Sequence, residues 1–384
     1  MIYLDNAATS FPKPDKVYEE VLRCMKEYCA NPGRGGHYMS IESGKAVMEA
    51  REAICSFFNI RNPMQLSFTK NATEALNVAI KGLLKAGDHV ITTTMEHNSV
   101  VRPLKTLEKE LGIELTFIQG NEYGEVDIAD IQRAVKENTR LIAATASSNV
   151  NGIIMPFRKI GEIAKAKGIV FLLDAAQGAG AITIDVEEDH IDMMAFPGHK
   201  SLLGPQGTGA LYVRENVILK ELMQGGTGSN SENVFQPEIM PDMLESGTLN
   251  TPGIVGMGAG VGFINSFGLE NIKLYKAMLV KKLHDGITEI GGMKLYSKND
   301  INHNSGIVAM NVDGIDSTEI SYVLDKVYGI ATRAGLHCAP MAHAALGTMK
   351  TGVVRFSIGC FNTVQEIDLV LNALKEIVLK TQNN

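Results

Sequence analysis

The chain has 384 residues, of which 45% are hydrophobic and 21% are charged, and these proportions exclude a mainly disordered protein. Its 36 Lys and Arg residues against 43 Asp and Glu residues give a net charge of −7, which argues against nucleic acid as a partner. No apolar run approaches the roughly 20 residues of a membrane span, and the N-terminus lacks a secretory signal, so no membrane partner is expected. The five Cys residues form no CxxC pair, which favours a reducing, cytoplasmic location.

Short β-rich segments alternate with amphipathic helical patterns in the first half of the chain. The expected strands are 66–68, 89–94, 114–118, 141–145, 169–173 and 210–213, and the expected helices begin near 71 and cover 99–111 and 157–167. Gly168 stands at the C-cap position that glycine prefers. Apolar strands joined by helices form a mainly parallel sheet covered on both faces, so we predict an α/β fold. Ligands of such a sheet bind beyond the carboxyl ends of its strands.

The pattern changes after about residue 265. Long helical segments are expected at 269–290, 316–327 and 363–380, beside short strands at 306–311 and 353–358. This pattern indicates a smaller α+β domain, and the chain length also favours two domains. We place the large domain at 14–264 and the small domain at 1–13 together with 265–384.

The first candidate site is the start of a helix, in the motif Asn71-Ala72-Thr73-Glu74. Small and hydroxyl residues at a helix N-terminus present backbone N–H groups and the positive end of the helix dipole, which suits a phosphate. The alternative is that Asn71 or Thr73 only caps the helix.

The second candidate is His97, in Met95-Glu96-His97 directly after the strand 89–94. This position lies at the sheet edge where ligands bind. The alternative is a loop histidine with a purely structural role.

The third candidate joins two strand ends. Asp174 follows the strand 169–173, with Gln177 three residues later, and Lys200 follows the next apolar strand in the motif Gly198-His199-Lys200. A lysine amine forms a Schiff base with an aldehyde cofactor, and a buried carboxylate keeps a pyridine nitrogen protonated. Together these groups suit pyridoxal 5′-phosphate (PLP), whereas a lone lysine in a Gly-rich loop is more often simply solvated.

Two further candidates lie in the C-terminal part. Cys338 follows His337 and a glycine turn, with Arg333 five residues upstream, and a cysteine in a basic loop suits a nucleophile. Arg355 interrupts the strand 353–358, and arginine binds carboxylates through two hydrogen bonds. The alternatives are a structural cysteine and a surface salt bridge.

Taken together, these motifs resemble the class V aminotransferase family of PLP-dependent enzymes, which has fold type I. Within that family the chain looks like a cysteine desulfurase or a selenocysteine lyase. The resemblance covers essentially the whole chain, from Tyr3-Leu4-Asp5-Asn6 to the last helix, and the motifs occur in the family's order. It implies a large domain with a mainly parallel seven-stranded sheet and a smaller α+β domain.

The resemblance also implies roles toward PLP. Lys200 would bind its aldehyde, Asp174 its pyridine nitrogen and Gln177 its phenolic oxygen, while His97 would stack on the ring. The remaining contacts would come from Ala72, Thr73 and His199 at the phosphate, from Asn149 near the oxygen edge, and from Thr248 toward the phosphate of a partner subunit. The last of these implies a homodimer with shared active sites.

By the same resemblance, L-cysteine or L-selenocysteine is the substrate and L-alanine the product. Arg355 would bind the substrate carboxylate, with Arg333 and Asn149 beside it. Lys200 would remove the α-proton, and Cys338 would accept the sulfur as a persulfide and pass it to an acceptor protein, as in iron–sulfur cluster assembly. The motif from Arg333 to Ala339 is similar to the short, ordered loop of the Suf-type branch.

The sequence departs from the family pattern in three places. Leu336 replaces the first His of the His-His-Cys motif, and Pro197 replaces a Ser that is common before Gly-His-Lys. The segment 225–247 is shorter than in typical members of that branch. These departures bear on proton delivery to Cys338, on phosphate binding and on partner identity.

Several alternatives remain open at this point. Another PLP enzyme of the same fold, such as a small-substrate transaminase, would need no Cys338. A nucleotide-binding oxidoreductase would carry a GxGxxG loop that opens a helix, whereas the segment 204–209 leads into a strand. A non-catalytic scaffold would be expected to lose Lys200 or Asp174. No metal is expected, because no second Cys/His pair with metal spacing accompanies His337 and His343.

Overall fold

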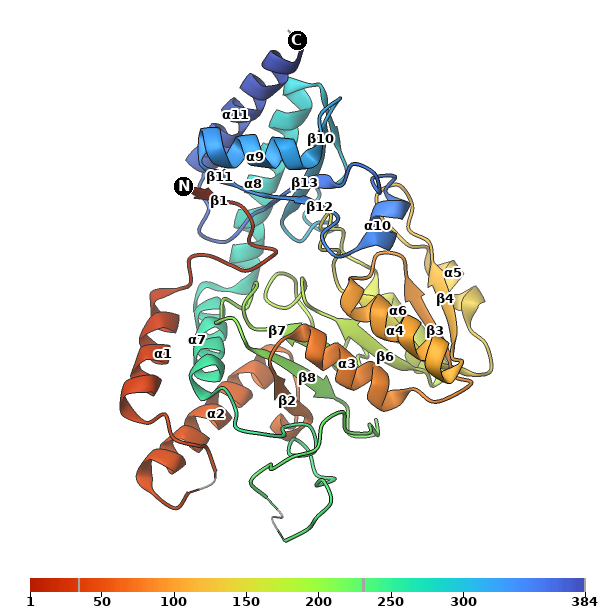
Figure 1. The fold of residues 1–384 in the computed structure, drawn as a ribbon, viewed down its shortest axis with the longest axis vertical. Coiled ribbons are helices and arrows are strands. Elements are labelled where there is room, and N and C mark those ends of the chain that lie inside the picture. Colours follow the sequence, from red (N-terminus) through yellow and green to blue (C-terminus); the bar gives the residue numbers. More distant parts are fainter. Residues whose placement is uncertain (34, 230–231, 383–384) are drawn as a thin grey trace.

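The structure is a computed structural model that describes residues 1–33, 35–229 and 232–382. Its larger sheet has seven strands in the order β2-β8-β7-β6-β5-β3-β4 (Figure 1). Only β8 runs antiparallel to its neighbours, which confirms the predicted mainly parallel sheet. The strands are β2 (Leu66–Thr69), β3 (His89–Thr93), β4 (Glu114–Ile118), β5 (Thr139–Thr145), β6 (Val170–Asp174), β7 (Met193–Pro197) and β8 (Gly209–Val213).

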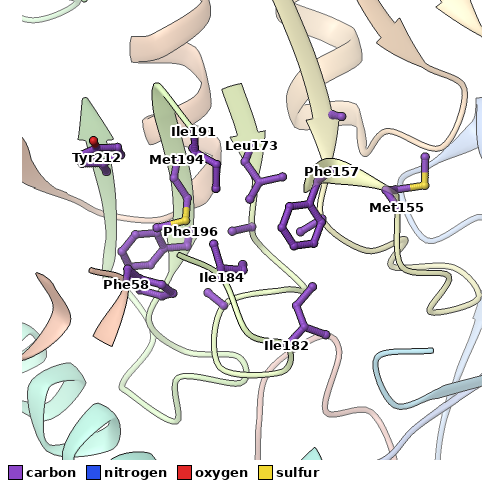
Figure 2. Packing of buried hydrophobic residues seen from close by; sticks show 14 of the residues in the cluster. Phe58, Met155, Phe157, Leu173, Ile182, Ile184, Ile191, Met194, Phe196 and Tyr212 are labelled. Atoms are coloured by element: carbon purple, nitrogen blue, oxygen red, sulfur yellow. The ribbon is translucent and has the colours of Figure 1, made fainter. Parts of the chain in front are cut away.

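Helices cover both faces of this sheet. Alternate strand residues point to opposite faces, so Leu172 joins the hydrophobic core beneath α3 (Ala72–Leu83) and α4 (Asn98–Leu111), whereas Leu173 joins the core on the other face. Figure 2 shows part of this second core, where Leu173, Met194 and Phe196 pack near Phe58. The helices on that side are α2 (Tyr38–Phe57), α6 (Phe157–Lys167) and α7 (Thr251–Phe267).

A second sheet has four strands in the order β12-β13-β10-β9. Its core is formed with α8 (Leu269–Ile290), α9 (Ser317–Tyr328) and α11 (Val364–Gln382). The strands are β9 (Met293–Leu295), β10 (Ile307–Val312), β12 (Arg333–Gly335) and β13 (Val353–Ser357), and the short helix α10 (Pro340–Ala345) follows β12. The domain limits proposed from the sequence stay a prediction.

The N-terminus lies beside the C-terminal elements (Figure 1). There β1 (Ile2–Tyr3) pairs in parallel with β11 (Ile330–Ala331), and Leu4 is buried in the core of the four-stranded sheet. The next segment crosses to the larger sheet, because the amide of Ser10 donates to the carbonyl of His199. Residues 1–10 therefore connect the two sheets next to the loop that carries Lys200.

The predicted elements agree with the structure to within a few residues, and α8 matches the predicted range 269–290. Gly168 ends α6 with a φ of 66°, the left-handed conformation expected of a C-cap glycine. The helices α1 (Asp15–Glu27), α2 and α5 (Ile128–Ala134) were not anticipated from the sequence. Among the described residues no single helix is long and apolar enough to cross a membrane, although α7 and α8, bent by 81°, pass that test as a pair.

Candidate active site

The predicted site residues gather at one edge of the seven-stranded sheet. The chain leaves β3 at Glu96 and His97, β5 at Asn149, β6 at Asp174 and β7 at Lys200. These strands are parallel, so their carboxyl ends meet at the same edge, where ligands bind in sheets of this kind. The loop after β12 and the strand β13 of the smaller sheet approach this edge and complete the site.

Asp174 and the half-buried Lys200 lie close enough for each charge to act on the other. Asp174 is 3% exposed, and its Oδ1 accepts a hydrogen bond of 2.9 Å from the amide of Ala176. Burial raises the pKa of this carboxyl, and the amide of Ala176 and the charge of Lys200 oppose the shift. Burial lowers the pKa of the Lys200 amine to about 8, with Asp174 again opposing. Lys200 therefore reaches its neutral form close to physiological pH.

A second buried carboxyl near Asp174, that of Glu96, was not identified as a site residue from the sequence. Glu96 is fully buried, and its Oε1 accepts hydrogen bonds from the Thr93 hydroxyl at 2.6 Å and the Thr145 amide at 3.0 Å. Its Oε2 is buried and finds no partner among the described residues. Burial, with a smaller effect of Asp174, raises the pKa of Glu96 to about 8. At neutral pH the Glu96 carboxyl is thus mostly protonated.

His97 has two structural partners at the start of α4. Its Nδ1 accepts from the amide of Ser99 at 3.1 Å and lies 2.9 Å from the Ser99 hydroxyl, so the ring caps the helix. Burial first, and then the charges of Lys200 and Arg333, lower the pKa of His97 to about 4. The ring is therefore neutral at physiological pH, and its capping bonds fix its orientation.

The N-terminus of α3 has the form that suits a phosphate. The side chain of Asn71 accepts from the amide of Glu74 at 2.9 Å, so Asn71 is the helix cap that the alternative reading required. The Thr73 hydroxyl bonds to the Ser99 hydroxyl at 2.8 Å and thereby joins α3 to α4. Capping by Asn71 uses the Glu74 amide, and no hydrogen bond of the described chain engages the amides of Ala72 and Thr73.

His199 and Gln177 fasten the N-terminal segment to the site. The carbonyl of His199 accepts from the Ser10 amide at 3.0 Å, and the Gln177 side chain donates to the carbonyl of Ala7 at 3.0 Å. The Nδ1 of His199 is buried and has no partner within the described residues. Burial, followed by the charges of Lys200 and Lys13, lowers the pKa of His199 to about 4.

Arg355 is the central cation on the side of the smaller sheet. It is 2% exposed, which overturns the surface salt bridge considered as an alternative. One guanidinium nitrogen donates to Oδ1 of Asp5 at 2.7 Å, and another donates to the carbonyl of Asn149 at 2.8 Å. Its Nε is buried without a partner among the described residues. Asp5 was not foreseen as a site residue, because it lies 350 positions away in the sequence.

Cys338 lies on an exposed turn between β12 and α10. His337 and Cys338 both have positive φ angles, 50° and 57°, a conformation that non-glycine residues adopt rarely and at an energetic cost. Two contacts hold the turn over the site. The amide of Asn98 donates to the carbonyl of Cys338 at 2.8 Å, and the Asn149 side chain donates to the carbonyl of His337 at 2.7 Å.

Behind this turn lies a pair of buried histidines. The rings of His337 and His343 stack with centroids 5.7 Å apart, and His343 bonds to the Thr348 hydroxyl at 2.7 Å. Burial lowers the pKa of His337 to about 3 and that of His343 to about 4, so both rings are neutral. Arg333 contributes its backbone carbonyl to His337 at 3.3 Å, while its side chain is exposed.

Thr248 is the one predicted site residue that the structure does not connect to the others. It is exposed in the segment before α7, and no hydrogen bond of the described chain involves its hydroxyl. Within the described ranges no group of three or more His, Cys, Asp or Glu side chains has the geometry of a metal site.

The family model described as aminotransferase class V matches residues 2–370. The chain belongs to the class V aminotransferase family. Enzymes of this family are generally PLP-dependent, and fold type I, predicted from the motifs, is confirmed. A relative named probable cysteine desulfurase, from Methanothermobacter thermautotrophicus, is 37% identical over 98% of this chain and 94% of its own length. A protein of the same name from Pyrococcus abyssi is 34% identical over 98% of this chain and 94% of its own length.

Solved structures of proteins named cysteine desulfurase are similar to this chain as well. The apo structure of a cysteine desulfurase from Thermococcus onnurineus NA1 is 33% identical, covers 99% of this chain and 95% of that chain, and superposes with a TM-score of 0.93. The cysteine desulfurase CsdA from Escherichia coli is 26% identical with a TM-score of 0.88, over 99% of this chain and 94% of that chain. The resemblance predicted from the sequence is thus confirmed over nearly the full chain.

Proposed function

We propose that the protein is a PLP-dependent cysteine desulfurase, which converts L-cysteine to L-alanine and transfers the sulfur to Cys338. The observation that carries the proposal is the turn of Cys338. It places an exposed cysteine at the N-terminus of α4, where the amide of Asn98, the residue after His97, donates to the carbonyl of Cys338. A simple transaminase has no use for a thiol at this place. The relatives named cysteine desulfurase support the same reading.

The residues at the sheet edge fit PLP. An amine with a lowered pKa, Lys200, suits the aldehyde, and the buried carboxyl of Asp174 suits the pyridine nitrogen. The unpartnered Nδ1 of His199 and the N-terminus of α3 at Ala72 and Thr73 suit the phosphate. When bound, PLP supplies an electron sink for the bond changes at the substrate Cα.

The chain's own groups then have defined tasks. Neutral Lys200 accepts the substrate α-proton at Nζ and returns it later, for which a pKa near physiological pH is suited. Neutral His97 would offer a flat, oriented face to the cofactor ring, and Gln177 and Asn149 would bind at the oxygen edge of the ring. Arg355, with a free Nε, binds the substrate carboxylate while Asp5 holds the guanidinium in place.

Cys338 receives the sulfur. Its thiolate attacks the substrate sulfur and forms an S–S bond, while the bond from that sulfur to carbon breaks. The electron pair of the broken bond stays on the carbon, which takes up a proton to give alanine, and a persulfide remains on Cys338. The exposure of the turn then leaves the persulfide open to an acceptor protein. Arg333, exposed beside this turn, adds positive charge for the substrate. A homodimer in which Thr248 reaches the partner's phosphate, and a cytoplasmic location, complete the proposal.

The test is alanine formation from L-cysteine by the purified, PLP-loaded protein with a thiol reductant present. We expect the wild type to form alanine and Cys338→Ala to lose at least about 100-fold in rate. Cys29→Ala is the matched control, because Cys29 is also exposed but lies far from the site in sequence. A wild type that forms no alanine from L-cysteine but does so from L-selenocysteine is a selenocysteine lyase. Equal rates for Cys338→Ala and the wild type remove Cys338 from the reaction.

A further inference from the structure

Lys276 is a buried lysine that the proposed reaction does not use. It lies on α8, is 9% exposed, and donates from Nζ to the carbonyl of Ser305 at 2.9 Å. No carboxylate of the described chain pairs with this amine, and Cys360 is the only other titratable group whose charge acts on it. An ammonium group without an anionic partner is costly to bury, and burial accordingly lowers the pKa of this amine.

The amine faces a cavity between the two sheets. One wall comes from the side of the larger sheet and the other from α8 and the loops around β10 and β13. Among the residues that line the cavity are Gln177, Leu203, Ile264, Ile272, Lys276 and Cys360. No Asp or Glu is among the described residues that line the cavity. The cavity adjoins the proposed cofactor site at Gln177 and at Ser201, the residue after Lys200.

The backbone at Gly306 makes room for the amine. A Cβ added to Gly306 would lie 2.6 Å from Cε and 2.7 Å from Nζ of Lys276, so any side chain at this position would displace the lysine. Gly306 has a φ of 117°, in the region that only glycine adopts without strain. The absence of a side chain at Gly306 thus leaves the space that the amine of Lys276 occupies.

A second amine increases the positive character of this region. Lys13 donates from Nζ to the Ser10 hydroxyl at 2.6 Å and to the carbonyl of His199 at 2.8 Å. Burial lowers its pKa to about 8, and Cys360 opposes the shift. Burial raises the pKa of Cys360, and Lys276 and Lys13 oppose this. The charges of Lys276 and Lys13 therefore both act on the thiol of Cys360, which is mostly protonated. No Asp or Glu among the described residues that line the cavity balances the two amines.

We propose that this cavity binds a compact monoanion, of the halide or hydrosulfide kind, on Nζ of Lys276. An anion there supplies a countercharge for the amine. It also accepts hydrogen bonds from the N–H groups of Nζ that do not donate to the carbonyl of Ser305. The cavity has a volume of about 30 Å³, room for one or two water-sized groups, which suits a compact anion better than a phosphate or a sulfate. Its walls are partly aliphatic, at Leu203, Ile264 and Ile272, and a weakly hydrated anion tolerates such walls. The proposal does not depend on the desulfurase reaction.

The test compares melting temperatures of the purified, cofactor-loaded protein in sodium bromide and in sodium gluconate at equal ionic strength. Gluconate is too large and too hydrated for the cavity. Ligand binding to the folded state raises the melting temperature, by about 1–3 °C for a weak site that is saturated. We expect this bromide-specific increase in the wild type and its loss in Lys276→Met. Lys281→Met is the control, because Lys281 lies on the same helix but is exposed and pairs with Asp285.

A second measurement does not depend on any variant. Anomalous diffraction from wild-type crystals soaked in sodium bromide is expected to show bromide beside Nζ of Lys276, and added sodium hydrosulfide is expected to displace it if hydrosulfide shares the site. Displacement by chloride but not by hydrosulfide identifies a halide site. Equal bromide responses of the wild type and Lys276→Met, or a cavity without bromide in the anomalous map, overturn the proposal.

Discussion

Glu96 and Asp174 are buried at the carboxyl edge of the seven-stranded sheet, with Lys200 half-buried there, whereas Cys338 lies on an exposed turn of the other half of the molecule. We call the first group the floor of the site and the turn of Cys338 its rim. In the floor, burial raises the pKa of Glu96 and lowers the pKa of Lys200, each to about 8. At the rim, the thiol owes its position to two strained residues and two backbone contacts. Proton transfer thus needs enclosure, while sulfur delivery needs access.

The largest effect is expected where the floor loses its amine. Lys200→Ala removes the only group that the proposal assigns to both cofactor attachment and proton transfer, so alanine formation should fall by at least about 1,000-fold. The visible absorption of the purified protein should disappear with it. Lys109→Ala, at an exposed position on α4, is the control and should leave both unchanged. A yellow, active Lys200→Ala protein would place the cofactor lysine elsewhere.

The next largest effect is expected at Arg355, which lies between the floor and the rim and is proposed to bind the substrate carboxylate. Arg355→Ala removes the proposed carboxylate partner, so the KM for L-cysteine should increase by about tenfold or more, which corresponds to about 1.4 kcal/mol of binding. Asp5→Asn keeps the arginine but removes its ion pair, and should raise KM by a smaller factor. An unchanged KM in both variants means that the substrate carboxylate binds another cation, and Arg333→Ala then tests the exposed alternative.

A smaller effect is expected on the pH dependence of stability, because Glu96 in the floor stays protonated at neutral pH. Burial raises the pKa of Glu96 from 4.5 to about 8 in the folded protein. The unfolded chain therefore releases this proton at lower pH than the folded one, and the free energy of unfolding falls as pH rises from 4.5 to 8. Glu96→Gln cannot release a proton and escapes this loss. Its melting temperature should equal that of the wild type near pH 4.5 and exceed it by about 5 °C at pH 8.

The control for this experiment is Glu122→Gln at an exposed position, which should shift neither value. Because Gln reproduces the neutral carboxyl, the Oε1 contacts with Thr93 and Thr145 should survive, and alanine formation should stay within about twofold. A Glu96→Gln protein whose advantage does not grow with pH would show that Glu96 is ionised in the folded state.

The sequence predicted two of the three floor residues, Asp174 and Lys200, but neither Glu96 nor Asp5, the partner of Arg355. Parallel strands bring their carboxyl ends together, so the positions of His97, Asp174 and Lys200 followed from periodicity and from the family motifs. Glu96 stands beside His97 in the sequence, but its role depends on complete burial, which one residue in a loop does not reveal. Asp5 escaped for another reason. It pairs with Arg355 across 350 residues, and only the path of the N-terminal segment between the two sheets makes that contact.

The smallest predicted effect separates capping from phosphate binding at α3. Asn71→Ala removes the cap on the Glu74 amide and should cost about 1 kcal/mol of stability, a decrease of about 2 °C in melting temperature. Thr73→Ala removes the hydroxyl that bonds to Ser99 and is proposed to face the phosphate. It should weaken PLP retention during dialysis about tenfold, whereas Asn71→Ala should change retention little. If the two variants lose PLP equally, the anion site depends on the order of the whole helix terminus and not on Thr73, because a frayed first turn no longer aligns its N–H groups.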